Sequence, residues 1–163
     1  MLLADLTWPA VAALDKNTPV IFPVAALEQH GRHMPVFTDS MLTNELVRRT
    51  EATFGARVLI APMMWLGNSH HHMDFPGTLS AEPRLYLDLL NGLMDNFIAH
   101  GFKRLVFLNG HGGNDIPGVM MAGAMRSYLH LARGESEAHL RRARAAVWEW
   151  ESQLAQRRGA ARP

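Results

Sequence analysis

Residues 18–31 read TPVIFPVAALEQHG, an apolar run that ends abruptly in polar residues. An uninterrupted apolar run of this kind is typical of a β-strand that is buried on both faces. Such strands occur mainly in parallel sheets, because helices cover both faces of those sheets. The segment therefore predicts a central parallel strand, with Glu28 and His30 just beyond its carboxyl end.

The same pattern of a strand followed by a helix recurs along the chain. Residues 58–62 and 104–108 form two further apolar runs that predict buried strands. Asp39 and Ser40 are suited to cap a helix that continues to Phe54, and Pro83 suits the first turn of a helix that ends before Gly101. A third helix is expected over residues 120–131. Three such repeats predict an α/β fold with three layers, α/β/α, around a mostly parallel sheet.

Composition and charge exclude several classes of protein. The chain has 163 residues, of which 48% are hydrophobic and 19% charged, which favours one folded domain over a disordered chain. A net charge of +1 gives no basic field for nucleic acid. Cysteine is absent, which excludes disulfides, thiolate metal sites and cysteine nucleophiles. No apolar run approaches the roughly 18 residues of a membrane-spanning helix, and the N-terminal residues lack the features of a signal peptide. We therefore expect a cytoplasmic protein that binds neither nucleic acid nor membranes.

Each cluster of polar residues in the chain follows a predicted strand. Ligands of open α/β sheets bind outside the carboxyl ends of the strands, so these clusters are expected to meet in a single site. The first cluster contains Glu28, His30 and, nine residues later, Asp39. Carboxylate and imidazole together favour zinc, manganese or iron(II) over calcium, and a two-oxygen group such as Asp39 can bridge paired metals. The competing interpretation is that Glu28 and His30 are ordinary polar residues that end a strand.

The second cluster is the turn NGHGGN at residues 109–114, in which three glycines surround His111. This turn lacks the spacing of either glycine-rich phosphate-binding motif, so we interpret it as a platform that presents the histidine. The alternative is an ordinary glycine-rich turn with an incidental histidine.

The third cluster, NSHHHMDFPGT at residues 68–78, contains three consecutive histidines. A regular backbone cannot direct all three at one metal, so one or two of them are expected to face solvent. Ser69 lacks the glycine pattern of a nucleophile elbow, which makes a serine hydrolase a poor interpretation. A water activated by a metal is then the natural nucleophile.

Three of these segments together resemble a known family. The stretch LEQHGRHMP at residues 27–35, followed by Thr38 and Asp39, is similar to a signature of the creatininase (creatinine amidohydrolase) family of metal-dependent amidohydrolases. HMDFPGT at residues 72–78 and NGHGGN at residues 109–114 resemble two further segments of that family, in the same order. The resemblance covers residues 18–130 and implies a creatininase-like fold.

The resemblance also implies roles for individual residues. It implies that four residues bind two divalent ions of zinc, manganese or iron, with Asp39 as the bridge: Glu28, His30, Asp39 and His111. It makes His72 and Asn109 the candidate catalytic residues, which either support the metal ligands or face the substrate. In creatininase itself a glutamate ligand lies two residues after the last histidine, and Gly113 takes that place here.

The implied activity is hydrolysis of a non-peptide C–N bond in a small cyclic or formylated amide by a metal-activated water. Members of the family tend to form hexamers, so the resemblance also implies a homo-oligomer.

The C-terminal part of the sequence differs in character. Residues 132–163 are rich in arginine and alanine, and a helical tail is expected there after a creatininase-like α/β domain over residues 1–131. The family's downstream motif has no clear counterpart in this tail, which suggests a C-terminally shortened member through truncation or a frame change. The alternative function is therefore a truncated member that is inactive or only binds metal and acts through contacts between subunits.

Overall fold

The computed structural model describes residues 1–114 of the chain. The helix predicted over residues 120–131 and the tail predicted over residues 132–163 lie outside the described residues. No helix within the described part is long and apolar enough to span a membrane.

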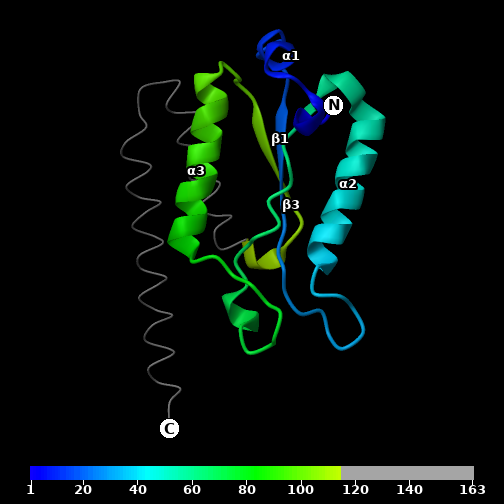
Figure 1. Cartoon of the computed structure of the whole chain (residues 1–163), viewed down its shortest axis with the longest axis vertical. Helices are drawn as coiled ribbons and strands as arrows, with labels where there is room; N and C mark the ends of the chain where they lie inside the picture. Colours follow the sequence, from blue (N-terminus) through cyan, green and yellow to red (C-terminus); the bar gives the residue numbers. More distant parts are fainter. Residues whose placement is uncertain (115–163) are drawn as a thin grey trace.

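The centre of the fold is a sheet of three parallel strands in the order β2-β1-β3 (Figure 1). The strands are β1 (Val20–Val24), β2 (Leu59–Ile60) and β3 (Leu105–Asn109). The predicted parallel pairing is confirmed, with the run at residues 18–31 supplying the central strand. β2 is shorter than predicted because Pro62 has no N–H to donate to the ladder. Beyond that proline the chain rejoins β1, where the Met64 N–H donates to the Pro23 carbonyl at 2.9 Å.

Two long helices, α2 (Thr38–Phe54) and α3 (Pro83–Ala99), lie on opposite sides of the sheet (Figure 1). This arrangement confirms the predicted α/β fold with helices on both faces. A short helix, α1 (Trp8–Ala12), precedes the sheet, and four 3₁₀ turns complete the described elements: Leu3–Asp5, Gly55–Arg57, His70–His72 and Gly112–Asn114.

The prediction that Asp39 and Ser40 cap α2 is wrong. The helix begins one residue earlier, at Thr38, and Phe37 precedes it without a capping side-chain bond. Both predicted caps have other partners: Ser40 Oγ donates to the Ala26 carbonyl at 2.8 Å, and the Asp39 carboxylate lies against a histidine. These two side chains tie the first turn of α2 to the segment that follows β1.

The apolar core lies between the sheet and α3. Phe22 of β1 is at its centre and packs edge to face on Phe97 of α3, with ring centroids 5.0 Å apart. α2 contributes little to this core. Its buried residues are all small or polar and lie in its first two turns: Thr38, Asp39, Ser40 and Thr43. The sheet is thus held to α3 by apolar packing and to α2 by polar contacts.

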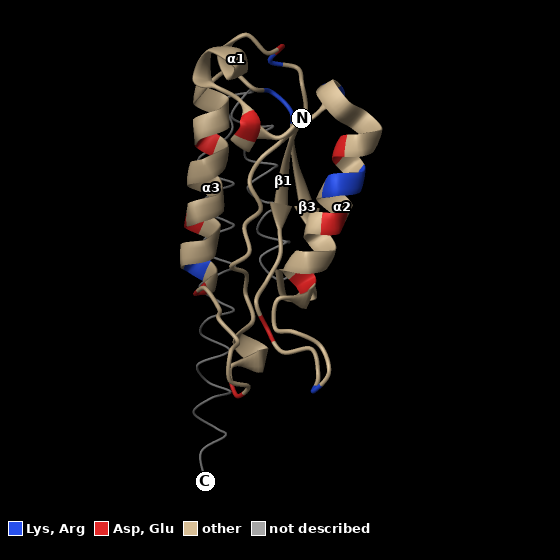
Figure 2. Cartoon of the chain, turned by 45° about the vertical axis from the view of Figure 1, so that its right-hand side comes forward, with Lys and Arg blue, Asp and Glu red and all other residues tan. Residues whose placement is uncertain are grey.

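Acidic and basic residues are interspersed along the outer part of α2 (Figure 2). Glu45 accepts hydrogen bonds from Arg48 and Arg49 at 2.8 Å, and these bonds, Arg48 first, lower the pKa of Glu45 to about 2. The carboxylate is accessible to solvent, with 42% of the Glu45 side chain exposed, so these ion pairs add little to stability.

Candidate metal centre

The carboxyl ends of β1 and β3 lie side by side, because Val24 pairs with Asn109. The backbone N–H of Gly110 extends this pairing by donating to the Val24 carbonyl at 2.9 Å. Glu28 follows β1 and His111 follows β3, so the chain brings both to one edge of the sheet. Asp39, in the first turn of α2, faces the same edge.

Asp39 lies between two imidazoles. Its Oδ1 is 3.0 Å from Nε2 of His30, and its Oδ2 is 2.7 Å from Nδ1 of His111. Both the carboxylate and His111 are largely removed from solvent, with 13% and 3% of the side chain exposed. One carboxylate oxygen thus faces each ring, which is the arrangement that a bridging carboxylate requires.

The other nitrogen of each ring is held by a backbone carbonyl. Nδ1–H of His30 donates to the Glu28 carbonyl at 3.1 Å, and Nε2–H of His111 donates to the Asn68 carbonyl at 3.0 Å. A carbonyl can only accept, so each of these bonds uses a proton on the ring nitrogen farther from Asp39. The Asp39 carboxylate is an acceptor too, and its Oδ1 is within hydrogen-bond distance of His30 Nε2, so a cation bound there would take the place of a proton. Histidines that bind metals are oriented in this way, with the free nitrogen directed at the ion.

Glu28 completes the cluster. Its side chain is 8% exposed, and its Oε2 lies 3.5 Å from Nε2 of His111. Ligand atoms of Glu28, His30 and Asp39 lie within 4.8 Å of one another. The structure therefore brings together all four predicted metal ligands.

Two carboxylate oxygens in this cluster lack hydrogen-bond partners among the described residues: Oε2 of Glu28 and Oδ2 of Asp39. The close contact of Oδ2 with His111 does not have the geometry of a hydrogen bond. Buried carboxylate oxygens without partners are costly unless a cation compensates them. The orphaned oxygens and the nitrogen donors around them fit a divalent metal ion.

The three consecutive histidines point in different directions. Nε2 of His70 lies 3.0 Å from Glu82 Oε1, away from the cluster, so this ring is engaged by protein rather than solvent. His71 and His72 both face Glu28, at 3.8 and 3.7 Å. Two of the three therefore meet the cluster, and only His71 is substantially exposed, at 52% of its side chain. Partial burial, and then the neighbouring His72, lower the pKa of the His71 imidazole, while Glu28 opposes the shift.

His72 differs from the other rings in its protonation. Nε2 of Gln29 lies 3.1 Å from His72 Nδ1, and the Gln29 amide is oriented because its Oε1 accepts from the Gly31 N–H at 2.9 Å. The Gln29 amide group therefore donates to His72 Nδ1, which leaves the proton of the neutral ring on Nε2. In this tautomer His72 presents an N–H to the cluster.

Asn109 supports the turn that carries His111. Its Nδ2 donates to the His111 carbonyl at 2.9 Å, and its Oδ1 accepts from the His111 backbone N–H at 3.2 Å. Between the two expected roles of Asn109, these bonds favour support of a ligand over contact with a substrate.

Gly110 allows α2 to approach this turn closely. A Cβ at position 110 would overlap Oγ1 of Thr43, a buried residue of α2, and would lie 3.0 Å from its Cβ. We expect Gly110→Ala to lower the free energy of unfolding by about 1–3 kcal/mol, because overpacking forces the two segments apart. Urea denaturation measures this change.

Two controls accompany this variant. Gly112→Ala, in the same turn, should have little effect because a Cβ there meets nothing within 4 Å. Combining Gly110→Ala with Thr43→Ala should recover part of the loss, because it removes the atom that overlaps. An equal loss in Gly112→Ala would show that the turn's backbone, and not Thr43, sets the cost.

The sequence of the chain is similar to known proteins. Residues 4–161 match the model of the family described as creatininase, creatinine amidohydrolase. The chain is 36% identical over 99 residues to the mycofactocin precursor peptide peptidase of Mycolicibacterium smegmatis, covering 58% of this chain and 40% of the relative. It is 32% identical over 123 residues to the creatinine amidohydrolase of Pseudomonas putida, covering 70% and 46%.

Solved structures agree with the fold. A crystal structure of creatinine amidohydrolase superimposes with a TM-score of 0.69 and 28% identity, over 81% of this chain and 52% of that one. A structure titled as the manganese form of creatininase gives a TM-score of 0.68, also at 28% identity, and the match covers the same shares of the two chains. The chain spans less than half the length of the curated relatives it matches and about half that of these structures.

Proposed function

The chain belongs to the creatininase family, and on that premise we propose that it is a metal-dependent hydrolase that cleaves a non-peptide C–N bond by means of a metal-activated water. The single observation that carries the proposal is the pair of imidazoles on either side of Asp39. Nε2 of His30 and Nδ1 of His111 lie 3.0 and 2.7 Å from its two oxygens, and a backbone carbonyl accepts from the other nitrogen of each ring. Oδ2 of Asp39 has no hydrogen-bond partner among the described residues despite this contact, so the site holds a buried carboxylate oxygen that a cation would compensate.

In this proposal Glu28, His30, Asp39 and His111 hold two divalent ions, with Asp39 as the bridge. When bound, such ions lower the pKa of a water and polarise the carbonyl of an amide. The backbone carbonyls of Glu28 and Asn68 keep the two histidine rings oriented. The manganese form of creatininase supports a divalent ion, with zinc and iron as the alternatives.

His72 and Asn109 complete the site. Asn109 keeps His111 in place through its two bonds to the turn. His72 is proposed to face the substrate, where its Nε2–H can donate to the oxygen of an amide carbonyl. Gln29 keeps that proton in position, because its own amide is oriented by Gly31.

The proposed substrate is a small cyclic or formylated amide. The relatives named above act on creatinine and on a peptide precursor, and a third relative, from Thermotoga maritima, is a 3-dehydro-scyllo-inosose hydrolase at 31% identity over 94 residues. Because their substrates differ, these relatives support hydrolysis, and the class of bond and the individual compound are left to experiment.

A homo-oligomer and a cytoplasmic location remain part of the proposal. Several apolar side chains on α2 are exposed, which is consistent with contacts between copies of the chain: Met41 at 54%, Leu42 at 65% and Leu46 at 46%.

Metal content tests the proposal directly. We expect about two ions per chain, by plasma mass spectrometry, in protein purified without a histidine tag and dialysed against metal-free buffer. Hydrolysis of cyclic and formylated amides should then depend on restoring that metal after chelation. A chain that holds no metal and takes up neither zinc nor manganese would contradict the proposal. That result would favour the alternative of a family member that acts through subunit contacts alone.

A further inference from the structure

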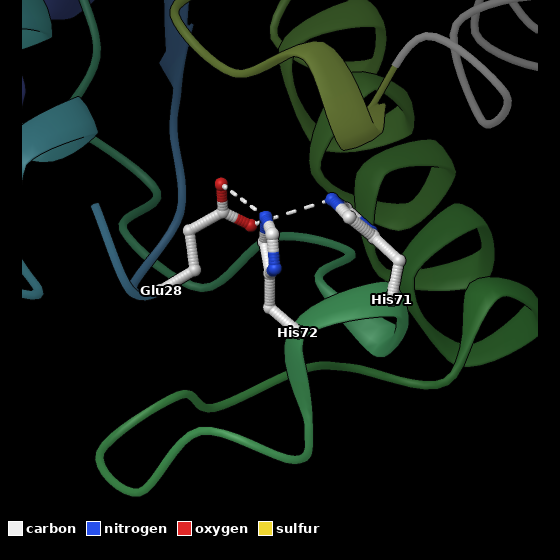
Figure 3. Close-up of side chains that lie close together, drawn as sticks. All are labelled: Glu28, His71 and His72. Carbon is white, nitrogen blue, oxygen red and sulfur yellow. Dashed lines mark ion pairs between the residues drawn. The ribbon is translucent and has the colours of Figure 1, made fainter. Parts of the chain in front are cut away.

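A second group of possible ligands lies beside the one described above. Glu28, His71 and His72 offer atoms that all lie within 4.8 Å of one another (Figure 3). Glu28 is common to both groups, and its Oε2, which has no hydrogen-bond partner among the described residues, faces His71. The 3₁₀ turn His70–His72 presents both rings to the carboxylate from the loop that follows β2.

The protonation of the two rings separates their roles. The Gln29 amide lies 3.1 Å from His72 Nδ1 and 3.5 Å from its Nε2, so the nearer nitrogen accepts the hydrogen bond and the proton of the neutral ring is on Nε2. His71 has no such donor among the hydrogen bonds of the described residues, and its Nε2 lies 3.8 Å from Glu28 Oε2. This separation exceeds an N–H···O hydrogen bond, at about 2.7–3.2 Å. It is suited to two ligands of one ion, since atoms that each lie about 2.0–2.2 Å from a metal are about 3–4 Å apart.

Gly113 makes the room that His71 occupies. A Cβ at position 113 would lie 2.9 Å from Cε1 of His71 and would overlap the Asn68 carbonyl and the His111 ring. With glycine there, the His71 ring lies parallel to that of His111, with an interplanar angle of 10° and centroids 6.2 Å apart. Any side chain at this position would force the His71 ring, along with its neighbours, to shift.

We propose that His71 is a further metal ligand of this chain, which together with Oε2 of Glu28 holds the second of the two ions, while His72 donates a hydrogen bond without binding metal. This inference rests on the proposed function and adds a ligand that the four-residue set lacks. The half-exposed position of His71 leaves the remaining coordination positions of that ion open to water or substrate, as catalytic metal sites require.

Matched variants of adjacent residues test the inference. Metal-free wild type, His71→Ala and His72→Ala are titrated with manganese or zinc in a calorimeter, and bound metal is counted by plasma mass spectrometry after dialysis. We expect about two ions in the wild type, about one in His71→Ala and about two in His72→Ala. His71→Asn should behave like His71→Ala, and thermal melting of the metal-free proteins separates a lost ligand from a lost fold.

The outcomes distinguish this inference from the function on which it rests. A wild type with two ions and a His71→Ala variant that also keeps two would overturn the role of His71 and leave the proposed function intact. Loss of one ion in His72→Ala but not in His71→Ala would show that His72 is the ligand, and would overturn the proposal for His71. A wild type that binds no metal would overturn both proposals together.

Discussion

Glu28→Gln should remove most of the metal that the chain binds and reduce hydrolysis by more than about 100-fold. The substitution keeps the size of the side chain, removes its negative charge and replaces one carboxylate oxygen with an NH2 group, which cannot bind a cation. Glu28 belongs to both groups of possible ligands, so a single change weakens both. Removing a group that merely supports a ligand typically costs about 10–100-fold in affinity or activity, and loss of a shared ligand should exceed that.

Thermal melting gives a second readout for the same variant. An ion that binds only the folded state stabilises it by about 2.7 kcal/mol when the free ion concentration is about 100 times the dissociation constant. For a chain of this length that corresponds to a rise in Tm of about 5–10 °C. We expect this rise on adding manganese to the wild type and its loss in Glu28→Gln. Without metal the variant should be at least as stable as the wild type, because a buried charge has been removed.

Glu45→Gln is the matched control. It is the same chemical change at a solvent-accessible position of α2, where the carboxylate pairs with Arg48 and Arg49. Metal content, activity and the effect of metal on Tm should all match the wild type. Metal binding that survives in Glu28→Gln at wild-type affinity would contradict the placement of the centre at Glu28.

Phe22→Ala should destabilise the fold by about 3–5 kcal/mol, the usual cost of truncating a large aromatic residue in a core. Phe22 is 5% exposed and lies at the centre of the apolar cluster. Its ring contacts Phe97 of α3 and Phe107 of β3, with centroids 5.0 and 5.5 Å apart. The change therefore leaves a cavity between the sheet and α3 that cannot close without moving both.

Denaturation in urea measures this loss, and Leu85→Ala provides a control. Leu85 is 66% exposed on α3, so its truncation should change stability by no more than about 0.5 kcal/mol. The metal centre lies at the carboxyl ends of the strands and not in this core, so the folded fraction of Phe22→Ala should still bind metal. Equal losses in the two variants would mean that the core between the sheet and α3 does not dominate stability.

Most of the fold could be predicted because it follows from local patterns. The apolar run at residues 20–24 and the proline at position 83 each determine where an element lies. The predicted cap of α2 was wrong because the Asp39 side chain can either cap a helix or contact histidines. The choice between them depends on His111, which is distant in the sequence.

The site could be predicted only in part, because some of its contacts join residues that are distant in the sequence. The resemblance to the family implied that Glu28, His30, Asp39 and His111 are ligands, and the structure places them together, but the resemblance gave His71 no role. Nothing local distinguishes His71 from its two neighbours. Its position depends on Gly113, on the other side of the site, and the proton on His72 depends on an amide that Gly31 orients. Such relations exist only once the chain has folded.

The polar docking of α2 has a consequence for motion. The helix is held to the sheet through Asp39, Ser40 and Thr43, with little of the apolar contact that secures α3. Local opening of its first turns would therefore break the contact between Asp39 and the histidines. Metal binding and closing of this helix end are then linked equilibria, so that each favours the other.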